Sequence, residues 1–186
     1  INVDRTKNFG LTENGKLQAA SIKLDEKVDL IFSSPYLRTL ETAEIISNNL
    51  GLDKSKIIVE EKLQEFQVGM KNEGRTWQEM YYESHEKINL YHDKIDGADE
   101  AKIDVVKRVA KFLSECEERY VGKTIICVTH NSPMSAVEIF NNGELYERAT
   151  GNLPKIHKFQ NAEILELDFH PLPVDETGAV NFHIPH

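Results

Sequence analysis

The chain has 186 residues, of which 40% are hydrophobic and 28% are charged, so its size and composition fit one globular domain with a substantial core. Its formal net charge of -9 excludes a broad nucleic-acid face and an anionic membrane surface, because either would need clustered Lys and Arg that carboxylates do not outnumber. A small anionic ligand is not excluded, since it needs only a local positive pocket.

The two cysteines, Cys116 and Cys127, are expected to be buried thiols rather than a disulfide framework. No signal peptide is visible, and no apolar run reaches ~18 residues. A reducing cytoplasm is therefore the simplest setting, and we expect no contact with a membrane.

Hydrophobic periodicity in the first half of the chain predicts two helices and two short strands. Thr12 fits the N-cap of the first helix, and Leu17, Ala20 and Leu24 form its expected apolar stripe. Gly51 is well placed to end the second helix. In chain order the predicted elements are helix 12–24, strand 28–32, helix 38–49 and strand 57–59.

The second half continues the alternation. Thr76 and Glu79 fit a capping box for a helix that reaches about residue 91, and we expect this helix to serve as a substrate lid. Its large side chains Trp77, Met80 and Tyr81 are expected to face the interior or a pocket mouth. The remaining predicted elements are a surface connection 91–100, helix 103–120, strand 124–128, a helix after Pro133 and a last strand 162–169.

Two strands are followed at once by polar residues that suit a ligand site. Arg38 follows strand 28–32, in the first turn of a helix, where a guanidinium would form half of a phosphate clamp. The alternative is a surface Arg paired with Glu41 or Glu44. His130 likewise follows strand 124–128, although a lone His is more often a hydrogen-bonded structural residue.

Together the two stretches are more specific. The pattern S-S-P-x-x-R-x-x-E-T-A, which contains Arg38, and the pattern V-T-H-x-x-x-M, which contains His130, lie about ninety residues apart. From about Leu11 to about Phe169 the chain resembles the histidine phosphatase superfamily, also called phosphoglycerate mutase-like. This resemblance implies an α/β fold with three α/β/α layers and a mostly parallel sheet.

The resemblance also implies roles for individual residues. Arg38 and His130 would hold the phosphoryl group, with the adjacent Asn131 among the substrate-binding residues. The segment Leu63–Gly69 matches an L-x-E pattern, so Glu65 would protonate the leaving oxygen as general acid. The implied reaction is phosphoryl transfer on a small phosphate ester, by a phosphatase or a mutase, through a phosphohistidine intermediate. Inorganic phosphate would be the other small partner.

One departure from the family pattern bears on activity. The phosphoryl-accepting His of the family belongs to an R-H-G motif upstream of an L-T-x-x-G segment. Residues 11–15 match that segment, but nothing before them reads R-H-G. We therefore expect the first strand and the acceptor His to lie upstream of Ile1, and residues 1–169 to be an N-terminally truncated domain that is inactive alone.

Residues 170–186 fall outside this resemblance. They look like the segment that re-enters the synthetase body in some bacterial isoleucyl-tRNA synthetases, which carry a phosphatase-like insertion just before it. The alternative function is thus a non-catalytic insert, covalently part of such a synthetase. The H-x-x-H of His183 and His186 lacks further ligands at known spacing, so we expect no metal, and the implied chemistry needs no cofactor.

Overall fold

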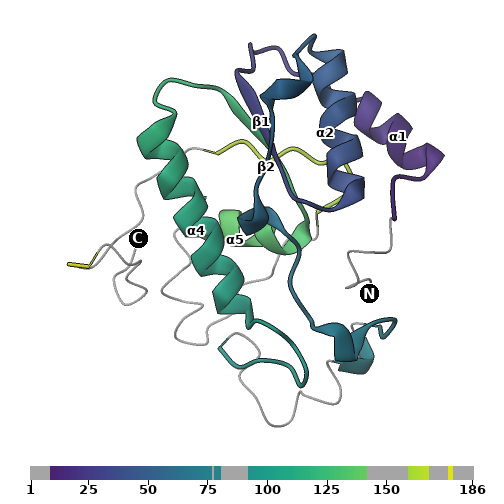
Figure 1. The fold of residues 1–186 in the computed structure, drawn as a ribbon, viewed down its shortest axis with the longest axis vertical. Helices are drawn as coiled ribbons and strands as arrows, with labels where there is room; N and C mark the ends of the chain where they lie inside the picture. The colour runs from purple at the N-terminus through teal and green to yellow at the C-terminus, as the bar shows by residue number, and fades with distance from the viewer. Residues whose placement is uncertain (1–8, 77, 81–91, 142–158, 168–175, 178–186) are drawn as a thin grey trace.

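The structure is a computed structural model of the chain. It describes residues 9–76, 78–80, 92–141, 159–167 and 176–177 (Figure 1). The tail 170–186 lies outside these ranges apart from two residues, so the domain boundary at residue 169 and the synthetase origin stay predictions.

Three parallel strands form the described sheet, in the order β2-β1-β3. The central strand β1 (Leu30–Ser33) is buried along its whole length, as expected for an apolar run in a parallel sheet. It pairs with β2 (Ile57–Val59) and β3 (Ile125–Val128), so that Phe32 lies beside Ile58 on one side and Cys127 on the other.

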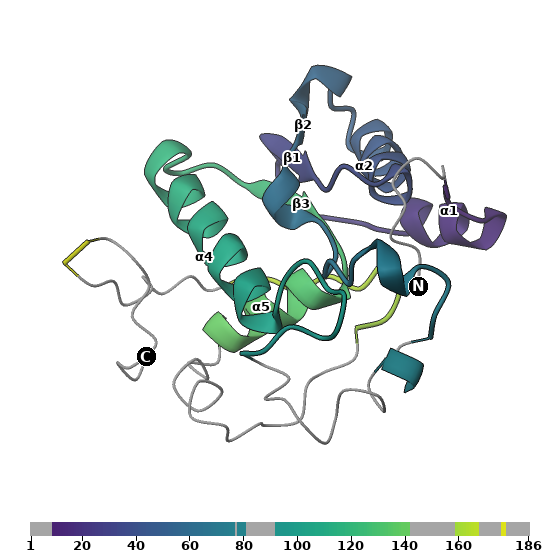
Figure 2. The same cartoon turned by 60° about the horizontal axis from the view of Figure 1, so that its bottom comes forward.

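Alternate residues of β1 face two different helix layers. Ile31 packs with Ala43 and Ile46 of α2 (Leu37–Asn49). Phe32 packs on the opposite face, where its ring centroid lies 5.1 Å from that of Phe112 in an edge-on contact. The helices of the two layers are α1 (Glu13–Ala20) and α2 on one side, and α4 (Lys102–Arg119) and α5 (Asn131–Asn141) on the other (Figure 1 and Figure 2). The three-layer α/β fold is confirmed.

The first helix differs from the prediction at its C-terminal end. Its N-cap is Thr12, whose hydroxyl accepts from the Gly15 N–H at 3.1 Å, but the helix stops at Ala20 instead of residue 24. Leu17 is 70% exposed, and Ala19 is the buried residue of this helix. The early stop has a packing reason, because it lets Leu24 reach the core beside α2 from outside the helix.

The second helix ends as predicted, with Gly51 at a positive φ of 65° directly after its C-cap. The capping box at Thr76 is also present, because the Thr76 hydroxyl accepts from the Glu79 N–H at 3.2 Å. Met80 is buried as expected. Trp77 and residues 81–91 lie outside the described residues, so the lid stays a prediction.

The predicted last strand is wrong over its described part, residues 162–167, which carry no strand. Ile164 and Leu167 are 54% and 38% exposed, so the alternating apolar side chains do not pack. A strand needs a partner edge, and the segment instead closes a local turn in which the Gln160 N–H donates to the Glu163 carboxylate at 2.6 Å. Cys127, expected to be buried, is exposed as a residue of an outer strand of the described sheet, although burial raises the pKa of its thiol.

Residues 92–100 are more than the predicted surface connection, because they pack against the loop that follows β2. Asn72, in the short 3-10 turn η3 (Met70–Asn72), is fully buried and donates to the Val68 and Asp96 carbonyls at 2.7 and 2.9 Å. Gly69 has a φ of 78°, and a Cβ there would lie 1.8 Å from the Gly97 carbonyl oxygen. This close approach requires glycine and locks the two loops together.

Candidate active site

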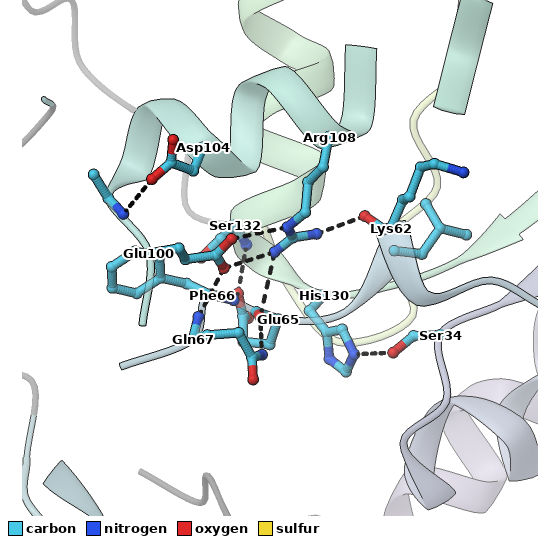
Figure 3. Close-up of polar contacts among 12 residues, drawn as sticks. Ser34, Lys62, Glu65, Phe66, Gln67, Glu100, Asp104, Arg108, His130 and Ser132 are labelled. Atoms are coloured by element: carbon cyan, nitrogen blue, oxygen red, sulfur yellow. Dashed lines mark hydrogen bonds and ion pairs between the residues drawn. The ribbon is translucent and has the colours of Figure 1, made fainter. Parts of the chain in front are cut away.

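The carboxyl ends of β1 and β3 bring two distant residues into contact. Ser33 and Val128 are paired in the sheet, so Ser34 and His130 leave the same edge on neighbouring strands. Ser34 is fully buried and His130 is 8% exposed. The Ser34 hydroxyl lies 2.7 Å from Nε2 of His130 (Figure 3).

Arg38 fixes the tautomer of His130. Its Nη2 lies 3.1 Å from Nδ1 of the imidazole. A guanidinium can only donate, so Nδ1 must be the accepting nitrogen. The single proton of the neutral ring therefore sits on Nε2, from which it is donated to the Ser34 hydroxyl.

Tyr36 supports both members of this pair from one side. The Arg38 guanidinium lies 4.5 Å from the centroid of the Tyr36 ring, a cation-π distance. The same ring meets His130 edge-on at 5.1 Å. Tyr36 is itself buried, so the guanidinium and the imidazole are held against a wall that excludes water.

Burial, together with the positive charges of Arg38 and Arg108, lowers the pKa of His130 to about 3. The imidazole is therefore neutral at pH 7. Burial also lowers the pKa of Arg38, an effect that the negative charge of Glu65 partly offsets.

Acidification is expected to destabilise the fold through His130. The pKa of His130 is 6.5 in an unperturbed imidazole and about 3 in the folded protein. Between these two pH values the unfolded chain therefore binds one proton that the folded protein does not bind. The stability contributed by the neutral ring is complete above about pH 6.5 and is lost as the pH falls toward about 3, with a slope of up to ~1.4 kcal/mol per pH unit. Urea unfolding between about pH 7 and about pH 5 should show a shallower pH dependence in His130→Gln than in the wild type. Identical slopes would contradict the buried neutral imidazole.

Glu65 lies at the start of α5, close to His130. It follows the 3-10 turn η2 (Glu61–Leu63), and its Oε1 accepts from the Phe66 N–H at 2.7 Å and the Ser132 N–H at 3.2 Å. Ser132 is in the first turn of α5, where backbone N–H groups favour an anion. The structure thus gathers a guanidinium, an imidazole and a carboxylate at one edge of the sheet.

The alternative partners of Arg38 are engaged elsewhere. The Glu41 carboxylate accepts from the Leu11 N–H at 2.5 Å, and Glu44 lies 3.3 Å from the Lys54 ammonium. Asn131, the remaining predicted binding residue, begins α5 next to His130 and is exposed. Its proposed contact with substrate stays a prediction.

Three residues of the site carry no role in the sequence analysis, namely Ser34, Tyr36 and Arg108. The first two lie within the S-S-P-x-x-R pattern, and only the fold shows that they touch His130. The sequence pattern around Arg108 could have indicated a role for it. Val105, three positions before it, and Phe112, four positions after it, are apolar and buried. An arginine on the apolar side of a helix indicates a buried ion pair.

Among the described residues, no group of three or more His, Cys, Asp or Glu side chains could hold a metal ion. Within the same residues, no helix is long and apolar enough to cross a membrane. The prediction that the chemistry needs no metal or cofactor remains open to test.

Comparison with known proteins identifies the family of the chain. The family described as the histidine phosphatase superfamily (branch 1) matches residues 2–171. The chain therefore belongs to this superfamily. It is 30% identical over 134 residues to phosphoserine phosphatase 1 of Hydrogenobacter thermophilus, covering 68% of this chain and 62% of that protein. It is 24% identical over 163 residues to phosphoglycerate mutase-like protein 4 of Arabidopsis thaliana, covering 83% of this chain and 66% of that protein.

Solved structures show the same fold. A phosphoserine phosphatase mutant from Entamoeba histolytica in complex with phosphoserine superimposes with a TM-score of 0.59 at 25% identity, covering 74% of this chain and 70% of that one. A mycobacterial glucosyl-3-phosphoglycerate phosphatase with inorganic phosphate gives a TM-score of 0.58 at 21% identity, covering 78% and 75%. The chain spans slightly less than two thirds of the length of the two curated relatives described above.

Proposed function

We propose that this domain hydrolyses a small phosphate monoester, with the phosphoryl group bound at Arg38 and His130. The observation that carries the proposal is the 3.1 Å contact between these two side chains at the carboxyl edge of a parallel sheet. Ligands of open α/β sheets bind at that edge, and the half-buried Arg38 guanidinium there supplies a positive charge partly shielded from water. The membership of the chain in the histidine phosphatase superfamily supports the same function.

In the proposed reaction, an acceptor imidazole attacks phosphorus in line, and the bond to the leaving oxygen breaks as a phosphohistidine forms. Arg38 stabilises the charge on the equatorial oxygens, and His130 does so by turning its Nε2–H from the Ser34 hydroxyl to a phosphoryl oxygen. Water then attacks the phosphohistidine, which releases phosphate and regenerates the free imidazole. We expect the acceptor in an upstream R-H-G motif, and that position stays a prediction.

Glu65 would protonate the leaving oxygen and afterwards deprotonate the attacking water. Both of its hydrogen bonds end on Oε1, from the Phe66 and Ser132 N–H groups. A proton on Oε1 would compete with these donors. We therefore assign the transferred proton to Oε2.

Phosphoserine is the first substrate to test. The Hydrogenobacter relative is named a phosphoserine phosphatase, and the Entamoeba structure of that name holds phosphoserine. The assay should use the natural full-length protein and compare phosphoserine with 3-phosphoglycerate. Acid-labile, base-stable label on the protein after brief mixing with a labelled ester would support the phosphohistidine step.

Inorganic phosphate is expected to bind this chain, and Arg38→Ala should raise its Kd about 10- to 100-fold. The variant removes charge-assisted hydrogen bonds, which are each worth about 1.5–3 kcal/mol. Isothermal titration at fixed ionic strength measures the affinity, and Arg119→Ala, at an exposed position in the last turn of α4, is the matched control. Equal losses of phosphate affinity in both variants would mean that the effect comes from net charge alone. Binding to the full-length protein without hydrolysis of any ester would favour the alternative, a non-catalytic insert.

A further inference from the structure

Arg108 links its own helix, α4, to Glu100 and to the loop that carries Glu65. Its Nε and Nη2 donate to the two carboxylate oxygens of Glu100, each at 3.0 Å, which makes a bidentate ion pair. The side chains are 15% and 12% exposed, respectively, so the pair is largely removed from water. Figure 3 shows this pair between α4 and the loop that carries Glu65.

The remaining donors of Arg108 reach the backbone of that loop. Nη1 donates to the Lys62 carbonyl, and Nη2 also lies 3.3 Å from the carbonyl of Glu65 itself. Glu100 completes the arrangement from the other side, because its Oε1 accepts from the Gln67 N–H at 2.8 Å. The ion pair therefore holds the backbone before, at and after Glu65.

We propose that Arg108 is a positioning residue, which together with Glu100 sets the place of the Glu65 carboxylate at the start of α5. The function of that carboxylate as an acid rests on the proposed phosphatase reaction. The contacts that place it do not depend on the reaction.

The loop needs such a support because residues 64–69 have no regular secondary structure of their own. Their buried carbonyl and N–H groups must find partners elsewhere. Thr129 fixes the residue before the loop by donating to the Leu63 carbonyl at 2.6 Å, and the Asp99 N–H donates to the Gln67 carbonyl at 3.0 Å. The Arg108–Glu100 pair contacts the Glu65 carbonyl, which also accepts from the Gln67 side-chain amide, and the Gln67 N–H. A shift of the backbone at Glu65 would move its carboxylate away from the Ser132 N–H, at 3.2 Å, and away from the leaving oxygen.

Only arginine fits this position. Two bonds to a carboxylate and two to carbonyl groups that diverge from it require the planar fork of donors in a guanidinium. A lysine ammonium would keep the charge but would not span the four acceptors. For Arg108→Lys we therefore expect values of kcat and of the amide exchange rate between those of the wild type and those of Arg108→Met.

The test compares Arg108→Met with Lys107→Met, which removes the same charge from an exposed position one residue earlier. Arg108→Met leaves the Glu100 carboxylate unpaired, so the double variant Arg108→Met/Glu100→Gln provides a version without a buried lone charge. Its amide oxygen can still accept from the Gln67 N–H. Each variant is made in the natural full-length protein.

Two measurements separate positioning from general damage. The first is kcat on an alkyl phosphate such as phosphoserine against kcat on p-nitrophenyl phosphate. A misplaced acid should cost on the order of 100-fold on the alkyl ester and about threefold or less on the nitrophenyl ester, whose leaving group hardly needs a proton. The second is amide hydrogen exchange at Phe66 and Ser132, the two donors to Glu65, which should quicken while exchange at Ile31 in the core stays unchanged.

The outcomes are distinct. Selective loss on the alkyl ester with faster exchange at Phe66, in the single and double variants but not in Lys107→Met, supports the proposal. Equal loss on both esters, or unchanged exchange at Phe66 and Ser132 in a folded variant, overturns it. If the wild type hydrolyses neither ester, the proposed function fails, whereas the exchange measurement still decides whether Arg108 positions Glu65.

Discussion

His130→Ala and Arg38→Ala are each expected to lower kcat for phosphate ester hydrolysis by on the order of 10²- to 10³-fold, about 3–4 kcal/mol. Arg38→Ala removes a cationic donor to the charge that develops on the phosphoryl oxygens in the transition state. His130→Ala removes the Nε2–H that we expect to turn from the Ser34 hydroxyl to the same oxygens. The site is shielded, since His130 is 8% exposed and the Tyr36 ring covers the guanidinium. Electrostatic interactions are strongest in such surroundings.

Whether the loss of activity appears in kcat or in KM shows how each residue acts in the mechanism. Interactions made mainly in the transition state lower kcat, whereas uniform binding of substrate and transition state appears only in KM. Because Arg38 and His130 contact each other, the double variant should lose far less than the product of the two single losses. Arg119→Ala controls for charge. A rise in KM alone, in either single variant, would make that residue a substrate anchor without a role in the chemical step.

The meeting of Arg38 and His130 was predictable because it needs only the parallel sheet. Strands that run in one direction present their carboxyl ends at one edge, so residues that follow neighbouring strands come together over 92 positions of sequence. The order of the motifs and the periodicity of the strands indicate which residues follow neighbouring strands. The predicted strand 28–32 overlaps β1, which is buried along its whole length.

The Arg108–Glu100 pair was not predictable in the same way. Its partners belong to a helix and to a connection whose loop packing depends on the close approach of Gly69 and Gly97. Local pattern also failed at Leu17, which is exposed, and at residues 162–167, where apolar periodicity predicted a strand that the described structure does not contain. Periodicity reports which face is apolar, and tertiary contacts decide whether that face is covered.

Glu65→Gln is expected to have an effect that depends on the leaving group. The amide keeps the size of the carboxyl group, and its Oε1 can still accept from the Phe66 and Ser132 N–H groups, so the loop should keep its place. It cannot give up a proton. The loss in kcat should therefore be on the order of 10²- to 10⁴-fold for phosphoserine and small for p-nitrophenyl phosphate.

The variants Glu65→Gln and Arg108→Met can be told apart by a second measurement. Arg108→Met and Glu65→Gln should share the selectivity for poor leaving groups, but only Arg108→Met should also quicken amide exchange at Phe66, because only that variant releases the backbone of the loop. Gln64→Ala, at the neighbouring position of the same loop, is the control for a general effect of changing this segment. Equal losses on both esters in Glu65→Gln would remove Glu65 from the acid role. Glu65 would then be a carboxylate that orients the start of α5 beside His130, and the leaving oxygen would have to take its proton from another group.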